Sequence, residues 1–305
     1  MIVPQPEILP GSKYSIPDAM NKTALTLSIV IVTYNTRQLA LDCVHSIFEA
    51  ARDLPLEVII VDNDSRDGTV AALREAFPAV NIIANSKNRY FSAANNQGIR
   101  AAAGRYVLAL NPDTLVRGDS LRQLVQYMQS HPAAGAATTT MHFPDGTLQR
   151  NGSRNVTLRY LIYEYTFMGK LFAARKRALN ATLWYADWDR TSEREVGVLP
   201  GSCIIAERET WLRVGGFDEA MPMYFSDDYF SLQVRKTGKQ TIYIPTDGIL
   251  HYENASTKQV SRRALIFYFR DLLAYAGRVF GRPAQMLLAL LLIPTLVVQH
   301  MRAKR

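Results

Sequence analysis

Two aspartates follow directly on short apolar runs, where their carboxylates could bind a cation or a polar ligand. Asp113 closes the segment Asn111-Pro112-Asp113 behind Tyr106–Leu110, and Asp62 comes directly after Leu56–Val61. Because proline cannot donate to a sheet ladder, a strand over Tyr106–Leu110 ends there and presents Asp113 just past its carboxyl end. Open α/β sheets bind ligands at this end, and a carboxylate there suits a hard divalent cation that carries substrate phosphates. Asn-Pro-Asp alone also fits a plain turn.

Asp62 allows two interpretations. A carboxylate at the end of a central strand can accept hydrogen bonds from the imide N–H of a uracil or thymine, or from ribose hydroxyls. It can equally cap the following turn, since Asp64, Ser65 and Asp67 are turn-forming residue types. Asp62 ends the strand whereas the other three make the turn, which favours the functional interpretation.

A second pair of acids, Asp227 and Asp228, follows Ser226. Ser226 is a predicted N-cap, so both acids fall in the first turn of a helix, where the macrodipole favours carboxylates. Their position alone therefore has a structural explanation that needs no catalytic role.

The elements that must position these acids alternate between strand and helix in the first half of the chain. Strands are predicted at Leu27–Thr33, Leu56–Val61, Val80–Ala84 and Tyr106–Leu110, and helices at Arg37–Ala51, Phe91–Ala103 and Gly118–Ser130. This alternation predicts an α/β fold with a mostly parallel, doubly wound sheet. Its strand ends should bring Tyr34-Asn35, Asp62 and Asp113 to one edge. Neither a G-x-G-x-x-G turn after the first strand nor a G-x-x-x-x-G-K-[ST] loop is present, which argues against dinucleotide-binding and P-loop enzymes.

The second half of the chain predicts a mixed sheet and an insertion. Asp145-Gly146 inside Met141–Gln149 indicates a hairpin. Asn151–Arg194 is irregular and rich in aromatic residues and arginine, which is typical of a lid or an acceptor-side loop. Its aromatic and acidic side chains suit a sugar acceptor, but they fit a satellite hydrophobic cluster equally well. The residues concerned are Trp184, Asp187 and Trp188, and Gly201 and Ser202 lie where the backbone of a predicted strand, Val196–Ile205, could approach a ligand.

Separate sequence blocks in family order carry a resemblance to a known family. They are SIVIVTYN (28–35), EVIIVDNDSRDGT (57–69), NRYFSAANNQGI (88–99), LNPDT (110–114) and GGFDE with the following MYF (215–225). Over residues 27–257 the chain resembles family 2 glycosyltransferases of the GT-A type, and within them most closely the bacterial rhamnosyltransferases of cell-surface polysaccharide synthesis. Three positions depart from the family pattern. Asn111 replaces the first acid of the commoner Asp-x-Asp, Tyr90 stands where glycine is usual, and Ser226 replaces a glutamate.

The resemblance implies an inverting glycosyltransferase that uses a dTDP- or UDP-sugar and Mg²⁺ or Mn²⁺. The implied acceptor is a glycan or a polyprenyl-diphosphate-linked sugar. Asp62 would contact the nucleobase, Asp113 would hold the metal, and His251, in the spacing H-x-x-x-x-S, would be a second metal or diphosphate ligand. Asp227 falls on the catalytic base and Asp228 is an extra acid beside it. The donor site expected from these blocks comprises Thr33, Tyr34, Asn35, Asp62, Asn88, Asn96, Asn111 and Asp113.

Two other functions stay open at this point. A nucleotidyltransferase on a related α/β sheet would use similar aspartates, but it normally has a phosphate loop bearing glycine and lysine near the first strand. A membrane-bound scaffold with a decayed transferase site would be consistent with Asn111 and Ser226.

We expect three units. The proline-containing residues 1–26 predict an irregular arm, the resemblance implies a glycosyltransferase domain at 27–257 with donor (27–140) and acceptor (141–257) halves, and charge sets apart a tail at 258–305. The tail holds nine basic residues and one acid, which accounts for the whole net charge of +8. A basic tail on a neutral body argues against nucleic-acid binding by the main domain. Its amphipathic helices fit a membrane interface, or else packing on the domain or in a homodimer.

Two further features bear on location. Cys43 and Cys203 are far apart in apolar stretches, so we expect buried reduced thiols and a cytoplasmic protein. The apolar run Met286–Val298 has 13 residues, fewer than the about 20 that a membrane span needs, and contains Pro294. We therefore expect peripheral contact with the inner face of the plasma membrane.

Overall fold

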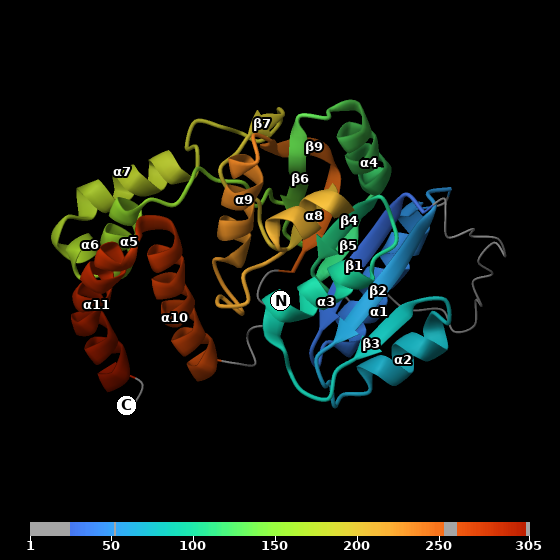
Figure 1. Cartoon of the computed structure of the whole chain (residues 1–305), viewed down its shortest axis with the longest axis horizontal. Coiled ribbons are helices and arrows are strands. Elements are labelled where there is room, and N and C mark those ends of the chain that lie inside the picture. The colour runs from blue at the N-terminus through green and yellow to red at the C-terminus, as the bar shows by residue number, and fades with distance from the viewer. Residues whose placement is uncertain (1–24, 52, 253–260, 303–305) are drawn as a thin grey trace.

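The computed structural model describes residues 25–51, 53–252 and 261–302 (Figure 1). The arm expected over 1–26 lies outside the described residues except for its last two. The strands are β1 (Leu27–Thr33), β2 (Leu56–Asp62), β3 (Asn81–Ala84), β4 (Tyr106–Leu110), β5 (Thr114–Val116), β6 (Ala134–His142), β7 (Arg194–Glu195), β8 (Cys203–Glu207) and β9 (Gln240–His251). The helices are α1 (Arg37–Ala51), α2 (Thr69–Ala76), α3 (Tyr90–Ala101), α4 (Ser120–Ser130), α5 (Leu158–Tyr165), α6 (Met168–Leu171), α7 (Ala173–Leu183), α8 (Arg208–Val214), α9 (Ser226–Lys236), α10 (Ser261–Phe280) and α11 (Arg282–Arg302).

The donor half of the sheet is parallel and covered on both faces, as predicted. Strand order β3-β2-β1-β4 is parallel throughout. Alternate side chains of β1 enter different cores: Ile29 and Ile31 pack with α1 and α4, whereas Val30 packs with α3, α8 and α9. Since neither face of β1, β2 and β4 meets water, these three strands are nearly continuous apolar runs. Gly98 of α3 permits this packing, because a Cβ there would lie only 2.3 Å from Val30 Cγ1.

Beyond β4 the sheet is mixed, as predicted. β8 runs antiparallel between β4 and β6, and β9 pairs parallel with β6 and antiparallel with β5. The strand expected at Val196–Ile205 starts only at Cys203, so its first boundary was wrong. β9 runs through Pro245 to His251, because a register shift between Thr139 and Met141 accommodates the irregularity.

A helical lobe, which we define as α5, α6, α7, α10 and α11, stands beside α9 at the left of Figure 1. The insertion Asn151–Arg194 was expected to be irregular, but three of these helices lie within it. The lobe has its own apolar core, including Leu161, Leu183, Leu272 and Leu288. Among the residues that the structure describes, no helix combines the length and the apolar character that a membrane crossing needs.

Helix α10 packs on the domain, which is one of the two alternatives for the tail. Its Tyr268 and Tyr275 rings lie 5.3 Å and 5.6 Å, centroid to centroid, from the ring of Phe225. Arg278 Nε also lies 2.9 Å from Asp218 Oδ2. The first helix of the tail is therefore part of the folded body.

The two cysteines are buried and free, as predicted. Burial raises the pKa of each thiol to about 12, so both are protonated at neutral pH.

Candidate active site

Asp62 lies at the carboxyl end of β2 with its carboxylate oriented by two donors. Thr33 Oγ1 donates to Asp62 Oδ1 over 2.8 Å, and the backbone N–H of Ser65 donates to Oδ2 over 2.9 Å. The neighbouring loop is fastened by Asn35, whose Oδ1 accepts the N–H of Arg66 and whose own N–H donates to Ser65 Oγ. Tyr34 next to it is exposed. The structure thus brings Thr33, Asn35 and Asp62 together at one sheet edge, with Asp62 fixed by other groups.

The segment after Asn88 keeps a backbone path that favours glycine, although a tyrosine occupies it. Tyr90 has φ +62°, in the left-handed region. Asn88 Oδ1 accepts the N–H of Tyr90 over 2.7 Å, and the Tyr90 ring packs on Phe267 of α10 at 4.6 Å between centroids. The departure from glycine at this position therefore costs local strain but leaves the path intact.

Asn96, predicted at the donor site, has a different task. Its amide donates to the carbonyl of Phe217 and accepts the N–H of the same residue, both over 2.8 Å. It is buried and ties α3 to the loop after α8. We leave it out of the donor site for that reason.

Asp113 and His251 face each other across the β5–β9 pair. Thr114, directly after Asp113, stands opposite His251 in the register. His251 Nε2 lies 3.6 Å from Asp113 Oδ1. Asp113 is only 3% exposed, so replacing it would disturb packing more than its place at a strand end suggested.

Gln149, which sequence reasoning missed, fixes the tautomer of His251. Its amide Nε2 donates to the His251 carbonyl over 2.7 Å, and its Oε1 lies 3.0 Å from His251 Nδ1. A backbone carbonyl can only accept, so the amide oxygen must face Nδ1, and a neutral ring must carry its proton there. The lone pair is then on Nε2, on the side of Asp113. The only signal in the sequence was the predicted hairpin at Met141–Gln149, which brings Gln149 back to β9.

These two side chains fit a divalent cation. Asp113 and a protonated His251 form an ion pair at 3.6 Å, and with a neutral ring the carboxylate oxygen and the Nε2 lone pair are two ligands that a cation can share. The hydrogen bond from Nδ1–H to Gln149 is the usual support of a metal-binding histidine. In the described part of the chain no three acidic, histidine or cysteine side chains cluster closely enough to hold a metal alone. Substrate phosphates and water would have to complete the coordination, as is usual for Mg²⁺.

Asp227 and Asp228 lie in the first turn of α9, as predicted, but Ser226 does not cap this helix. The cap is Phe225, with φ +62°, and it makes no side-chain cap hydrogen bond. Asp227 Oδ2 accepts the N–H of Gly201 over 2.8 Å. A Cβ on Gly201 would come within 3.2 Å of the same oxygen, so glycine allows the close approach. The backbone of Gly201 was expected to approach a bound ligand, but the group that it approaches is the Asp227 carboxylate.

The two carboxyl groups differ in how readily they ionise. Burial raises the pKa of Asp227, and its hydrogen bonds from Gly201 and Asp228 oppose that rise. Burial raises the pKa of Asp228 well above its usual value, and the charge of Asp227 adds to the rise. Asp228 is therefore the member that more readily keeps its proton, and Asp227 is the member that more readily ionises and can take a proton.

One short turn connects the two halves of the site. The N–H of Asn111 donates to the Ser202 carbonyl over 3.0 Å, and the preceding Leu110 pairs with Cys203. Gly201, on the other side of Ser202, holds Asp227. The Gly201-Ser202 turn thus joins Asp227 to the carboxyl end of β4, two residues before Asp113.

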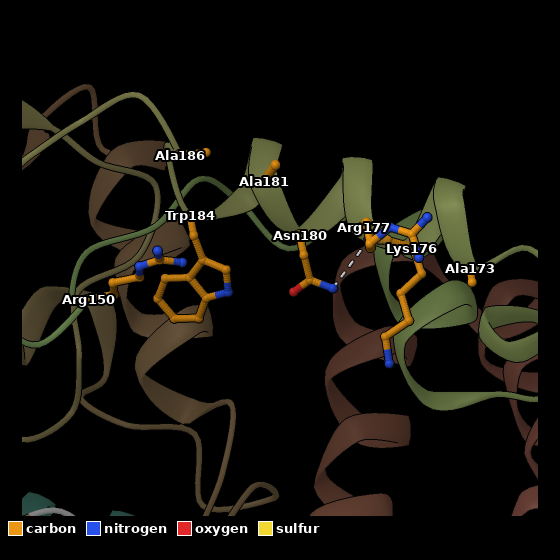
Figure 2. Close-up of a pocket in the computed structure, with 8 residues that line it drawn as sticks. All are labelled: Arg150, Ala173, Lys176, Arg177, Asn180, Ala181, Trp184 and Ala186. Carbon is orange, nitrogen blue, oxygen red and sulfur yellow. Dashed lines mark hydrogen bonds between the residues drawn. The ribbon is translucent and has the colours of Figure 1, made fainter.

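The residues Trp184, Asp187 and Trp188, which were predicted on the acceptor side, lie in three different environments in the structure. Trp188 is buried against Tyr243, with ring centroids 4.8 Å apart, and belongs to the core. Asp187 is exposed. Trp184 lines a cavity of about 710 Å³ under α7, together with Arg150, Lys176, Arg177 and Asn180 (Figure 2). Arg150 and Trp184 lie at one end of this cavity and Lys176, which is ion-paired with Glu164, lies at the other.

Comparison with known proteins gives a consistent family. The family described as glycosyl transferase family 2 matches residues 28–186. The N-acetylglucosaminyl-diphospho-decaprenol L-rhamnosyltransferase of Mycobacterium tuberculosis is 28% identical over 246 residues, which cover 76% of this chain and 77% of the relative. The rhamnosyltransferase WbbL of Escherichia coli is 22% identical over 179 residues, or 59% of this chain and 64% of WbbL.

Solved structures confirm the fold. The mannosyltransferase PcManGT of Pyrobaculum calidifontis, in complex with GDP-Man and Mn²⁺, aligns with a TM-score of 0.56 at 19% identity, over 88% of this chain and 68% of that one. GalNAc-T7 with UDP, GalNAc and Mn²⁺ aligns with a TM-score of 0.57 at 15% identity, over 76% of this chain and 44% of that one. The chain has the GT-A fold.

Proposed function

The chain belongs to glycosyl transferase family 2, and on that premise we propose that it transfers a hexose or deoxyhexose, rhamnose in the first instance, from a nucleoside-diphosphate sugar. The proposed acceptor is a glycan or a polyprenyl-diphosphate-linked sugar of cell-envelope polysaccharide synthesis. The observation that carries the proposal is that one turn, Gly201-Ser202, bonds both to Asp227 and to Asn111, which lies two residues before Asp113. The names of two relatives, both rhamnosyltransferases, support the choice of sugar.

In this proposal the sugar donor binds to the half of the domain formed by residues 27–140. Asp62 accepts from the nucleobase or the ribose, while Asp113 and His251 hold Mg²⁺ or Mn²⁺ against the diphosphate. When bound by these two side chains, the cation would supply positive charge to neutralise the departing nucleoside diphosphate. The fixed Nδ1–H tautomer of His251 and the Mn²⁺ in the two similar structures support this assignment.

Asp227 performs the proton transfer on the acceptor. Its carboxylate takes the proton of the acceptor hydroxyl as that oxygen attacks the anomeric carbon in line with the leaving group. The new C–O bond forms while the bond to the diphosphate breaks, and the nucleoside diphosphate leaves with the bonding electrons. The configuration at the anomeric carbon is inverted. The Gly201 N–H keeps Asp227 oriented throughout.

The acceptor lies on the side of residues 141–257, beside the helical lobe. Trp184 offers a stacking face for a sugar, and the cations at its cavity suit an anionic diphosphate. Asp187 stays in the proposed acceptor region as an exposed acid, whereas buried Trp188 does not.

Helix α11 supplies the proposed contact with the membrane. The whole positive excess lies in residues 258–305, where basic residues attract anionic lipid by about 1 kcal/mol each near its surface. Leu288 and Leu292 face the core of the lobe, whereas a stripe at helical spacing faces outward. Its members are Met286, Leu290, Ile293 and Val297, which are 71%, 64%, 52% and 51% exposed.

The enzymatic proposal is tested with purified protein, a panel of dTDP-, UDP- and GDP-sugars, Mn²⁺ and an N-acetylglucosaminyl-diphospho-polyprenol. We expect acceptor-dependent release of nucleoside diphosphate that EDTA abolishes. Release of pyrophosphate would identify nucleotidyl transfer instead. Donor binding without turnover would identify a decayed enzyme, and no donor binding at all would overturn the proposal.

The membrane contact is tested by flotation with phosphatidylglycerol vesicles, and phosphatidylcholine vesicles serve as the uncharged reference. Glutamine at Met286, Leu290 and Ile293 should release the protein. Glutamine at Leu148 and Leu212, which are also exposed but lie outside the lobe, should not. Equal binding by both variants, or none by the native protein, would remove α11 from the proposal.

A further inference from the structure

The single acid of residues 258–305, Asp271, is buried in the body of the enzyme. Its side chain is 0% exposed, and Oδ2 accepts the backbone N–H groups of Met223 and Tyr224 over 3.0 Å and 3.1 Å. Oδ1 lies 3.4 Å from Arg270 Nε. A carboxylate is costly to bury unless hydrogen bonds compensate for its lost hydration, and here two of its partners are main-chain groups of a distant segment.

That segment leads directly into the catalytic pair. Phe225, next after Tyr224, has φ +62° and begins α9. Left-handed backbone at a bulky residue costs of order 1–3 kcal/mol and persists only where the surroundings hold it. Most of the contacts here come from α10, because Asp271 holds the two preceding N–H groups and Tyr268 and Tyr275 pack on the Phe225 ring, with Tyr165 of α5 as a further ring neighbour.

We propose that Asp271 is a positioning residue, which holds Met223–Phe225 in the conformation that directs Asp227 to Gly201 and the acceptor. The proposal rests on the proposed function, in that it takes Asp227 as the base. The path runs from Asp271 through two backbone N–H groups to Phe225, and from there through the first turn of α9. It does not pass through Asp62 or Asp113, so Asp271 acts on the chemical step and leaves donor binding alone.

A mere packing role makes a different prediction. If Asp271 only fastened α10, any equal loosening of that helix would have the same effect. Arg278 provides the comparison, because its ion pair with Asp218 also joins α10 to the domain but does not touch Met223 or Tyr224.

The experiment compares Asp271→Leu, Asp271→Asn and Arg278→Leu in the full chain. Leucine has a similar volume but accepts no hydrogen bond, whereas the asparagine oxygen can still accept both N–H groups. We expect Asp271→Leu to lower kcat tenfold or more, with the donor Kd from calorimetry changed less than twofold. Asp271→Asn should restore kcat to within about threefold, and Arg278→Leu should stay in the same range. Hydrogen exchange at Met223 and Tyr224 should accelerate in Asp271→Leu alone.

Several outcomes decide the matter. Equal losses of kcat in Asp271→Leu and Arg278→Leu, or no rescue by asparagine, would overturn the positioning role. If Asp271→Leu does not fold, Asp271→Ser replaces it, since a serine hydroxyl is too short to reach both N–H groups. A native enzyme that turns over no donor would refute the proposed function rather than this inference.

Discussion

Replacing Asp228 by alanine tests whether Asp228 lowers the pKa of Asp227 and so keeps it ionised. Burial and the charge of Asp227 favour the protonated form of Asp228, and a protonated Asp228 is a donor for the neighbouring Asp227 carboxylate. Alanine removes this donor and leaves the Gly201 N–H in place. A hydrogen bond to a charged group contributes about 1.5–3 kcal/mol, and 1.36 kcal/mol corresponds to one factor of ten. The ionised form of Asp227 should therefore become roughly ten- to a hundredfold less populated at a given acidic pH.

The sign of the pH effect follows from the role of Asp227 as a base. Loss of a donor raises its pKa, so activity should be lost at a higher pH as the solution is made acidic. Well above that pH the variant should work normally. The measurement is kcat/KM for nucleoside diphosphate release between about pH 5 and pH 9.

Two amide variants complete this test. Asp228→Asn supplies an N–H donor to Asp227 and should keep a nearly native pH profile. Asp227→Asn removes the base and should lower kcat about 10²–10⁴-fold at every pH, which is about 2.7–5.4 kcal/mol, without weakening donor binding. A profile of Asp228→Ala that superimposes on the native one would refute the proton assignment. Greater damage by Asp228→Asn than by Asp227→Asn would make Asp228 the base.

Three further substitutions address the donor and metal groups. Asp113→Asn, which suits this buried position better than alanine because it keeps the volume, should abolish Mn²⁺-dependent turnover at nearly native thermal stability; near-native activity in EDTA would contradict the metal role. Asp62→Ala should weaken binding of the free nucleoside diphosphate by calorimetry more than it lowers kcat, and unchanged affinity would remove Asp62 from the donor site. Gln149→Leu should weaken Mn²⁺ binding about 10–100-fold, as measured by electron paramagnetic resonance with nucleotide present, because His251 loses its orienting acceptor. Gln126→Leu, at an exposed position of α4, is its matched control, and equal Mn²⁺ affinity in the two variants would count against Gln149.

The donor half was predictable because three of its strands, β1, β2 and β4, are short runs of largely buried residues. Leu27–Thr33 and Tyr106–Leu110 were predicted with their observed bounds, and Asp62 and Asp113 followed from the ends of such runs. The local pattern of apolar residues predicts these strands and their ends, so no contact between distant segments is needed for the prediction.

The rest of the site depends on contacts between segments far apart in the chain. Gln149 meets His251 across 102 residues, and Asp271 meets Met223 across 48. Ser226 had the residue type of an N-cap, yet the packing of Phe225 against α10 placed the cap one residue earlier. In the insertion, aromatic residues and arginines obscured the helical pattern of α5 and α7. These helices pack on each other, and α5 also packs on the distant α11, in a core to which α10 contributes.

One turn of α10 touches the beginnings of two other helices. Phe267 packs on Tyr90 at the start of α3, and Asp271, four residues on, holds the segment before α9. Four residues rise about 6 Å along a helix, so one short stretch of α10 contacts both the start of α3 and the segment before α9. For a chimaera that joins the sheet of one relative to the tail of another, this matching is a compatibility rule. The residues at 90, 223–225, 267 and 271 have to come from the same parent, because a tail exchanged without them would not make these contacts.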